Sequence, residues 1–182
     1  YNAAKAFPEK MTAFLRKMLN VWVQAQDGAY MDMAKWKACQ VDKIPIDTRG
    51  MSVYVGFDMS AKIDLTSVAF VIPFRSGEYD STGKEIIKFI VYSHSFIPNR
   101  AKLAERKQKD KVDYDAWERM GFLTVTNTPI VDQNAVMKYV LDTCKENGWK
   151  IETLCFDPAN AGKLMMDLSD SGYDVEEVLQ SY

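Results

Sequence analysis

The sequence contains few histidine and cysteine residues. Its 182 residues include one histidine, His94, and three cysteines, Cys39, Cys144 and Cys155. A single histidine excludes His-rich metal sites, and we expect His94, which lies among apolar residues, to be structural. Because the cysteines are odd in number and have no CxxC spacing, they support neither a disulfide framework nor a thiolate zinc site. This cysteine usage is typical of a protein from a reducing compartment.

The chain also lacks an excess of charge of one sign and a long apolar run. Lys and Arg number 23 against 25 Asp and Glu, which gives a formal charge of −2. This balance excludes a strongly basic nucleic-acid module as a description of the whole chain, although not a local basic face. The longest apolar stretches, such as residues 68–74, are far shorter than the roughly 20 residues of a membrane helix, and no signal-peptide pattern is present. We therefore expect a soluble protein with no membrane partner.

The composition of the sequence is typical of a folded domain. Hydrophobic residues make up 47% and charged residues 26% of the chain, a balance that is typical of globular proteins and not of disordered ones. A chain of this length can bury a sizeable core without disulfide or metal staples. Because it begins with Tyr1 and carries no initiator methionine, we expect it to be a piece of a longer protein.

The first fifty residues differ from the rest in their pattern of apolar residues. An apolar stripe with helical spacing predicts an amphipathic helix; it is formed by Met11, Phe14, Leu15, Met18, Leu19, Trp22 and Val23. A second short helix is expected over residues 31–39, followed by an aperiodic connector over 40–50. Because this segment holds no core of its own, we place a domain boundary near Thr48. Residues 1–50 are then a helical lead-in segment from a preceding domain, and residues 51–182 form the main domain.

From Met51 onward, extended patterns replace helical ones. Apolar runs predict strands over residues 52–57, 65–74, 85–95, 121–126, 151–156 and 173–179. Turn formers between the second and third strands predict an antiparallel hairpin. Helices are expected within the charged segment 98–120, broken near Asp110, and then over 132–148 and 160–171. Three antiparallel strands followed by alternating helices and strands predict an α/β fold with a sheet of mixed direction.

Two aspartates stand where strands end, at positions where α/β proteins bind ligands. Asp58 ends the first strand, and Asp157 follows the strand over residues 151–156. If these strands are parallel neighbours, both carboxylates emerge at one edge of the sheet, where they would repel each other unless a cation lies between them. Mg²⁺ is the natural candidate, because it prefers hard oxygen ligands. Asp64 is expected to be a hairpin residue, with a contact to the same metal site as the alternative.

An aspartate at a strand end also has an ordinary structural explanation. Such residues are frequent as helix N-caps and turn formers, and Asp157-Pro158 is a common turn dipeptide. From their spacing alone, Asp58 and Asp157 are therefore either metal ligands or structural residues.

Two blocks of the sequence, VYVGFDMSAKIDLTSVAFVIPF over residues 53–74 and LCFDPANAGKLMMDL over residues 154–168, resemble the nuclease half of tailed-bacteriophage terminase large subunits. The lead-in segment is similar to the region that joins the ATPase and nuclease domains of that family, so the resemblance covers nearly the whole chain. It implies a ribonuclease-H-like fold that cuts double-stranded DNA with two metal ions, Mg²⁺ or Mn²⁺, during genome packaging. By position, it implies that Asp58 and Asp157 are the metal ligands of the first and fourth strands.

The resemblance also implies partners and a location, and the sequence departs from the family in two ways. The expected partners are double-stranded DNA, a small terminase subunit and a portal, in the cytoplasm of a bacterial host. The ATPase domain of the family is missing, since Gly77…Gly83-Lys84-Glu85 has the wrong spacing for a phosphate-binding loop and lacks its Ser or Thr. The third acidic ligand of the family comes from a final helix beyond this chain, and Asp170 and Asp174 lie in the wrong element. We therefore expect a metal site that lacks one ligand and a nuclease that is weakly active or inactive.

Two other functions fit the residues. Actin-like kinases and ATPases also place an aspartate after a first strand, but the glycine-rich loop that usually follows is missing between Met59 and Lys62. A DNA- or protein-docking module with structural carboxylates is the non-enzymatic alternative. The chain also has a dense basic run, formed by Arg100, Lys102, Arg106, Lys107, Lys109 and Lys111. We interpret this run as a solvated helix with interleaved acidic residues, and contact with a DNA backbone is the alternative.

Overall fold

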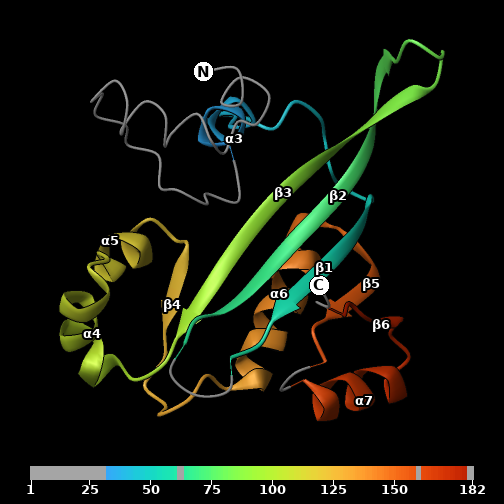
Figure 1. The fold of residues 1–182 in the computed structure, drawn as a ribbon. Coiled ribbons are helices and arrows are strands. Elements are labelled where there is room, and N and C mark those ends of the chain that lie inside the picture. The colour runs from blue at the N-terminus through green and yellow to red at the C-terminus, as the bar shows by residue number, and fades with distance from the viewer. Residues whose placement is uncertain (1–31, 61–63, 159–160, 180–182) are drawn as a thin grey trace, which may run out of the picture. The chain divides into compact units, whose positions relative to one another are not determined.

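The structure is a computed structural model, and it describes residues 32–60, 64–158 and 161–179, which are coloured in Figure 1. The chain divides into two compact units, Tyr1–Pro45 and Ile46–Tyr182. Among the helices of the described ranges, none has both the length and the apolar character that crossing a membrane requires.

The first unit contributes one described helix, α3 (Met33–Ala38). It begins at Asp32, whose carboxylate accepts hydrogen bonds from the backbone N–H groups of Ala34 and Lys35. This side chain satisfies donors that a helix start otherwise leaves unpaired. The amphipathic helix expected over residues 11–23 lies outside the described residues.

The second unit is built on a mixed sheet of six described strands (Figure 1). The strands are β1 (Ser52–Asp58), β2 (Thr66–Tyr79), β3 (Glu85–Ile97), β4 (Leu123–Val125), β5 (Lys150–Phe156) and β6 (Val175–Glu177). Their order across the sheet is β4-β3-β2-β1-β5-β6. β2 is antiparallel to both β1 and β3, whereas β4 pairs parallel to β3, and β5 pairs parallel to β1 and β6. The α/β fold with a mixed sheet that the sequence predicts is therefore confirmed.

Helices occupy the connections after β3. They are η1 (Arg100–Lys102), α4 (Leu103–Asp110), α5 (Tyr114–Arg119), α6 (Gln133–Asn147) and α7 (Gly162–Asp170). The break expected near Asp110 is present, because Lys111 takes a left-handed conformation with φ 55° and ends α4. The charged segment around α4 and α5 is more than a surface loop. It folds around a small apolar cluster of Ile97, Leu103, Tyr114, Leu123 and Val125.

Helix α6 covers one face of the sheet and begins and ends where the sequence predicts. The Asp132 carboxylate accepts a hydrogen bond from the backbone N–H of Asn134, at 2.9 Å. Gly148 closes the helix with φ 66°, a conformation that glycine adopts without a side-chain penalty. Between these ends, the ring of Tyr139 packs against Phe70 of β2 and against rings on β3.

The β2–β3 hairpin is longer than the sequence pattern indicates. Turn formers over residues 75–84 predict a wide turn, but β2 continues to Tyr79. The additional strand residues are polar, and they pair through side chains, as when Arg75 forms an ion pair with Glu85 at 3.1 Å. A register irregularity follows Arg75 and accommodates Gly77 at φ 72°. At this end of the hairpin, ion pairs join β2 to β3. The alternation of apolar and polar residues, from which a strand is predicted in the sequence, is missing there.

His94 is a buried structural residue, as expected, with 6% of its surface exposed. Its Nδ1 lies 3.0 Å from the carbonyl oxygen of Gly121, and its Nε2 lies 2.9 Å from the Thr124 hydroxyl. A neutral ring protonated at Nδ1 satisfies both contacts, since Nδ1–H donates to the carbonyl and Nε2 accepts from the hydroxyl. The ring also stacks on Tyr139, with centroids 4.3 Å apart. Burial lowers the pKa of His94, and the hydrogen bond to Gly121 opposes this only in part.

This lowered pKa predicts a loss of stability in mild acid. Below a pH of about 6.5 the unfolded chain binds a proton on His94 that the folded chain resists. The free energy of unfolding should therefore fall as the pH drops from about 7 to about 5, and urea titrations at each pH measure it. In His94→Gln, which does not titrate, this part of the slope should vanish. An unchanged slope in that variant would contradict the assignment.

Candidate functional site

The candidate site forms where β1 and β5 end side by side. The two strands are parallel, and their register closes with Phe57 opposite Phe156. The next residue on each strand is an aspartate, Asp58 at the end of β1 and Asp157 directly after β5. Neighbouring strands lie about 4.8 Å apart. The register therefore brings together, at one edge of the sheet, two carboxylate residues that are far apart in the sequence.

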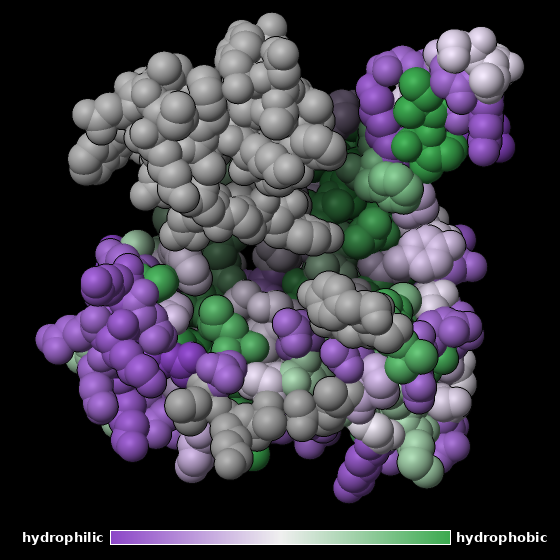
Figure 2. All heavy atoms as spheres, viewed as in Figure 1, coloured by the Kyte–Doolittle hydropathy of each residue, from purple (hydrophilic) through white to green (hydrophobic). Residues whose placement is uncertain are grey.

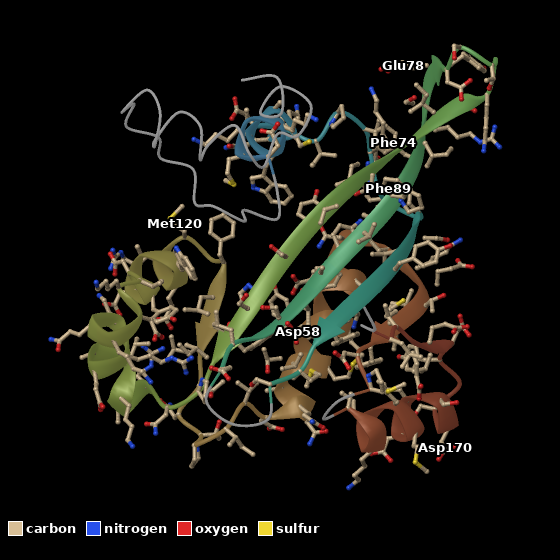
Figure 3. The ribbon with its side chains drawn as sticks, viewed as in Figure 1. Asp58, Phe74, Glu78, Phe89, Met120 and Asp170 are labelled. Carbon is tan, nitrogen blue, oxygen red and sulfur yellow. The ribbon has the colours of Figure 1, made fainter. Side chains whose placement is uncertain are left out.

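An aromatic pair fixes the ends of these two strands. The rings of Phe57 and Phe156 stack with their centroids 4.3 Å apart and their planes at 6°, and both side chains are buried. Because side chains alternate along a strand, Phe57 lies on the core face with Val55, and Asp58 lies on the opposite face, where it is exposed. Figure 3 shows Asp58 at this end of β1. The buried rings hold the register, and the carboxylate of Asp58 stays accessible.

The chain that follows Asp58 is held by a buried threonine. Thr66, at the start of β2, is fully buried. Its hydroxyl oxygen accepts a hydrogen bond from the backbone N–H of Ser60 at 3.1 Å and lies 3.1 Å from the Ser60 hydroxyl. Our sequence reading missed this residue, although a threonine opening an otherwise apolar strand was the signal for it. Thr66 therefore fixes the turn by which the chain leaves Asp58.

Asp64 points toward the helical insertion between β3 and β4, which contains η1, α4 and α5, and most of its side chain is exposed. Its side chain is 88% exposed, and its carboxylate lies 3.6 Å from the Arg106 guanidinium of α4. Arg106 in turn contacts Asp110 at 3.1 Å. The recorded ion pair of Asp64 is thus with α4, and a contact of Asp64 to a metal at Asp58 stays a prediction.

The two aspartates set aside in the sequence analysis lie elsewhere. The carboxylate of Asp174 accepts a hydrogen bond from the Thr153 hydroxyl at 2.8 Å, which ties the chain before β6 to β5. Asp170 is exposed at the end of α7, and Figure 3 shows it well away from Asp58.

A cleft of about 680 Å³ opens at the same edge of the sheet. The loop after β1 lines it at Ser60, the start of α6 lines it at Asp132 and Asn134, and α7 lines it at Lys163 and Asp167. Clefts outside the carboxyl ends of strands are where open α/β sheets bind their ligands. The lining of the cleft includes Ser60, two residues after Asp58, but neither Asp58 nor Asp157.

The donors at this edge suit a hard divalent cation. Mg²⁺ and Mn²⁺ take carboxylate oxygens and retain bound water, so two carboxylates at neighbouring strand ends fit them. Within residues 32–60, 64–158 and 161–179, no group of three or more His, Cys, Asp or Glu side chains is placed to share an ion. Asp58 and Asp157 are therefore the two carboxylates that could serve as ligands at this edge of the sheet, with water as the other ligands.

A family model matches the whole chain, and two known proteins are similar to most of it. The family model described as "Terminase large subunit, endonuclease domain" matches residues 1–182. Protein YmfN of Escherichia coli (strain K12) is 29% identical over 178 residues, which cover 93% of this chain and 36% of that protein. The terminase large subunit of Enterobacteria phage HK97 is 27% identical over 128 residues, which cover 70% of this chain and 22% of that protein.

A solved structure shares the fold. The crystal structure of the HK97 bacteriophage large terminase matches with a TM-score of 0.63 and 22% sequence identity, over 100% of this chain and 35% of that chain. The chain therefore spans little more than a third of the length of these relatives, or less.

The buried hydrogen bond at Thr66 gives a stability prediction. Thr66→Val keeps the shape of the side chain but removes the acceptor for the Ser60 N–H, and leaving that donor unpaired should cost about 1–3 kcal/mol. Urea denaturation measures this loss. Thr66→Ser retains the hydroxyl and serves as the matched control, and it should lose less than the valine variant. Equal stability of wild type and Thr66→Val would show that the hydroxyl does not hold this turn.

Proposed function

The chain belongs to the family of terminase large subunit endonuclease domains, and we propose that it acts as a metal-dependent endonuclease on double-stranded DNA. The observation that supports this most directly is the register of β1 and β5, which sets Asp58 beside Asp157. Two bound Mg²⁺ or Mn²⁺ ions would stabilise the charge on the attacking and leaving oxygens of the phosphodiester. Asp58 and Asp157 are the residues that would hold them.

The surrounding residues have positioning roles in this proposal. The stacked rings of Phe57 and Phe156 hold the ends of the two strands together, next to Asp58 and Asp157. Thr66 fixes the turn after Asp58, and the cleft beside that turn, which Ser60 lines, would hold part of a DNA strand near this edge of the sheet. A docking module would not require carboxylates at two neighbouring strand ends, and this favours the enzyme over the docking alternative.

The biological role follows from the family as a further proposal. The endonuclease would cut concatemers of double-stranded DNA during genome packaging, in the cytoplasm of a bacterial host. A small terminase subunit and a portal would be its partners. Because the chain spans about a third of its relatives, these are roles of a whole terminase to which this domain contributes the cutting step.

Cleavage of plasmid DNA tests the proposed function. We expect the chain to nick or cut supercoiled plasmid slowly in Mn²⁺ or Mg²⁺ and not in EDTA. Asp58→Asn and Asp157→Asn each remove a metal ligand and should lower the rate by at least about 100-fold. Agarose gels of the product over time give the rates.

Asp170→Asn is the control for this experiment, since it removes an exposed carboxylate far from the site and should leave the rate unchanged. Cleavage that continues in EDTA, or that survives both Asp58→Asn and Asp157→Asn, would contradict the proposal. Absence of cleavage together with absence of Mn²⁺ binding would favour the docking module.

A further inference from the structure

A second cavity, of about 240 Å³, lies between α4 and the loop after β1. Helix α4 and the chain before it line the cavity with Asn99, Lys102, Glu105, Lys109 and the ion pair of Arg106 with Asp110, and Asp64 lines it from the chain before β2. β3 runs in the same direction as β1, because both are antiparallel to β2. Asn99, two residues after β3, is therefore at the same edge of the sheet as Asp58.

The ion pairs of the insertion divide its basic run into two groups. Arg100 pairs with Glu118, Arg106 pairs with Asp110, and Lys107 pairs with both Asp113 and Asp115. These pairs engage four of the acidic side chains in the segment. The arginines and Lys107 therefore help to hold the insertion together, which agrees with the structural interpretation of the run for these three residues.

Lys111 is the residue at which α4 ends, and the other two lysines of the run have no such role. Among the described residues, Lys102 and Lys109 form no ion pair, and both are exposed. With Arg106 they occupy positions i, i+4 and i+7 along η1 and α4, and this spacing sets all three on one side of the helix. Figure 2 shows hydrophilic residues gathered over the α4 and α5 region. Among the described residues, two ammonium groups that form no ion pair thus line the cavity, beside the carboxylates of Glu105 and Asp110.

Asp64 marks the place of an anion in this cavity. Its contact to Arg106 is long, at 3.6 Å, and its own side chain is 88% exposed, whereas Arg106 is only 18% exposed. An exposed ion pair of this kind is weak. A phosphate can replace the carboxylate at small cost, because guanidinium groups bind phosphate oxygens at least as well as carboxylate oxygens.

We propose that this cavity binds a backbone phosphate of the DNA substrate, with Lys102 and Lys109 as its main ligands and Arg106 at its inner wall. The proposal rests on the proposed function, since it takes DNA as the substrate. Asp58 lies opposite Ser67, and Ser67 lies opposite Ser95 near the end of β3. Asp58 and Ser95 are thus two strand spacings, about 10 Å, apart, and the cavity begins beyond Ser95, at Pro98, so the bound phosphate belongs to a different nucleotide from the one at Asp58. A phosphate bound at this site would fix the position of the DNA strand relative to Asp58 and Asp157.

DNA binding without cleavage tests this proposal. Fluorescence anisotropy of a labelled blunt duplex is measured in EDTA at several NaCl concentrations, with the wild-type chain and with the double variant Lys102→Gln/Lys109→Gln. We expect the double variant to bind about tenfold more weakly. The slope of log Kd against log[NaCl] should fall by about 0.9, the value for the loss of one phosphate contact. Arg106 is left intact, because its pair with Asp110 is part of the fold.

The control is Lys145→Gln/Lys150→Gln, which removes the same charge near the start of β5, at the opposite edge of the sheet. It should change neither the affinity nor the salt slope appreciably. Thermal unfolding of both double variants checks that they fold, as exposed lysines should allow.

Three results would overturn the proposal: an unchanged salt slope in Lys102→Gln/Lys109→Gln, an equal loss in both double variants, or no binding by the wild-type chain. The measurement uses uncleaved DNA in EDTA, so it is independent of Asp58 and Asp157. Failure of the phosphate site would therefore leave the nuclease proposal standing, and failure of cleavage would leave this binding result standing.

Discussion

The parallel register between β1 and β5, closed by the stacked rings of Phe57 and Phe156, is the constraint on which the candidate site depends. Both rings are buried on the core face at the last paired position of the two strands. Asp58 and Asp157 are the next residues along the chain, and they therefore lie at the edge of the sheet. A slip of one residue would turn Asp58 into the core and Phe57 into solvent. Burial of both rings makes that slip costly, and the same apolar contact that stabilises the fold therefore sets the spacing of the two carboxylates.

The structure shows how the charged side chains are distributed. A formal charge of −2 gives no reason to expect a DNA-binding surface, but charges are not distributed evenly. The insertion between β3 and α6 engages most of its acidic side chains in internal ion pairs and leaves Lys102 and Lys109 beside a cavity. Our interpretation of the basic run as a solvated helix holds for the paired residues, and the cavity gives the two lysines a separate explanation.

Much of the fold could be predicted from the sequence, because local signals agree with the final contacts. Asp132 and Gly148 bound α6 as a cap and a C-terminal glycine should, and the apolar run at residues 52–57 becomes β1. The length of β2 could not be predicted, since its last residues pair through ions and not through apolar alternation. Thr66 was also missed: its role depends on a partner, Ser60, that only the antiparallel register brings close. The positions of Asp58 and Asp157 could be predicted from strand direction, but their chemistry could not, because carboxylates at strand ends serve equally as caps and turns.

The central claim is that Asp58 and Asp157 form a single metal site. A double-mutant cycle on Mn²⁺ binding, measured by isothermal titration calorimetry with wild type, Asp58→Asn, Asp157→Asn and the double variant, tests it most directly. If both carboxylates hold the same ions, each single variant loses most of the affinity, and the double variant loses little more than either one. Effects that add independently, or Mn²⁺ binding that neither substitution changes, would contradict the account.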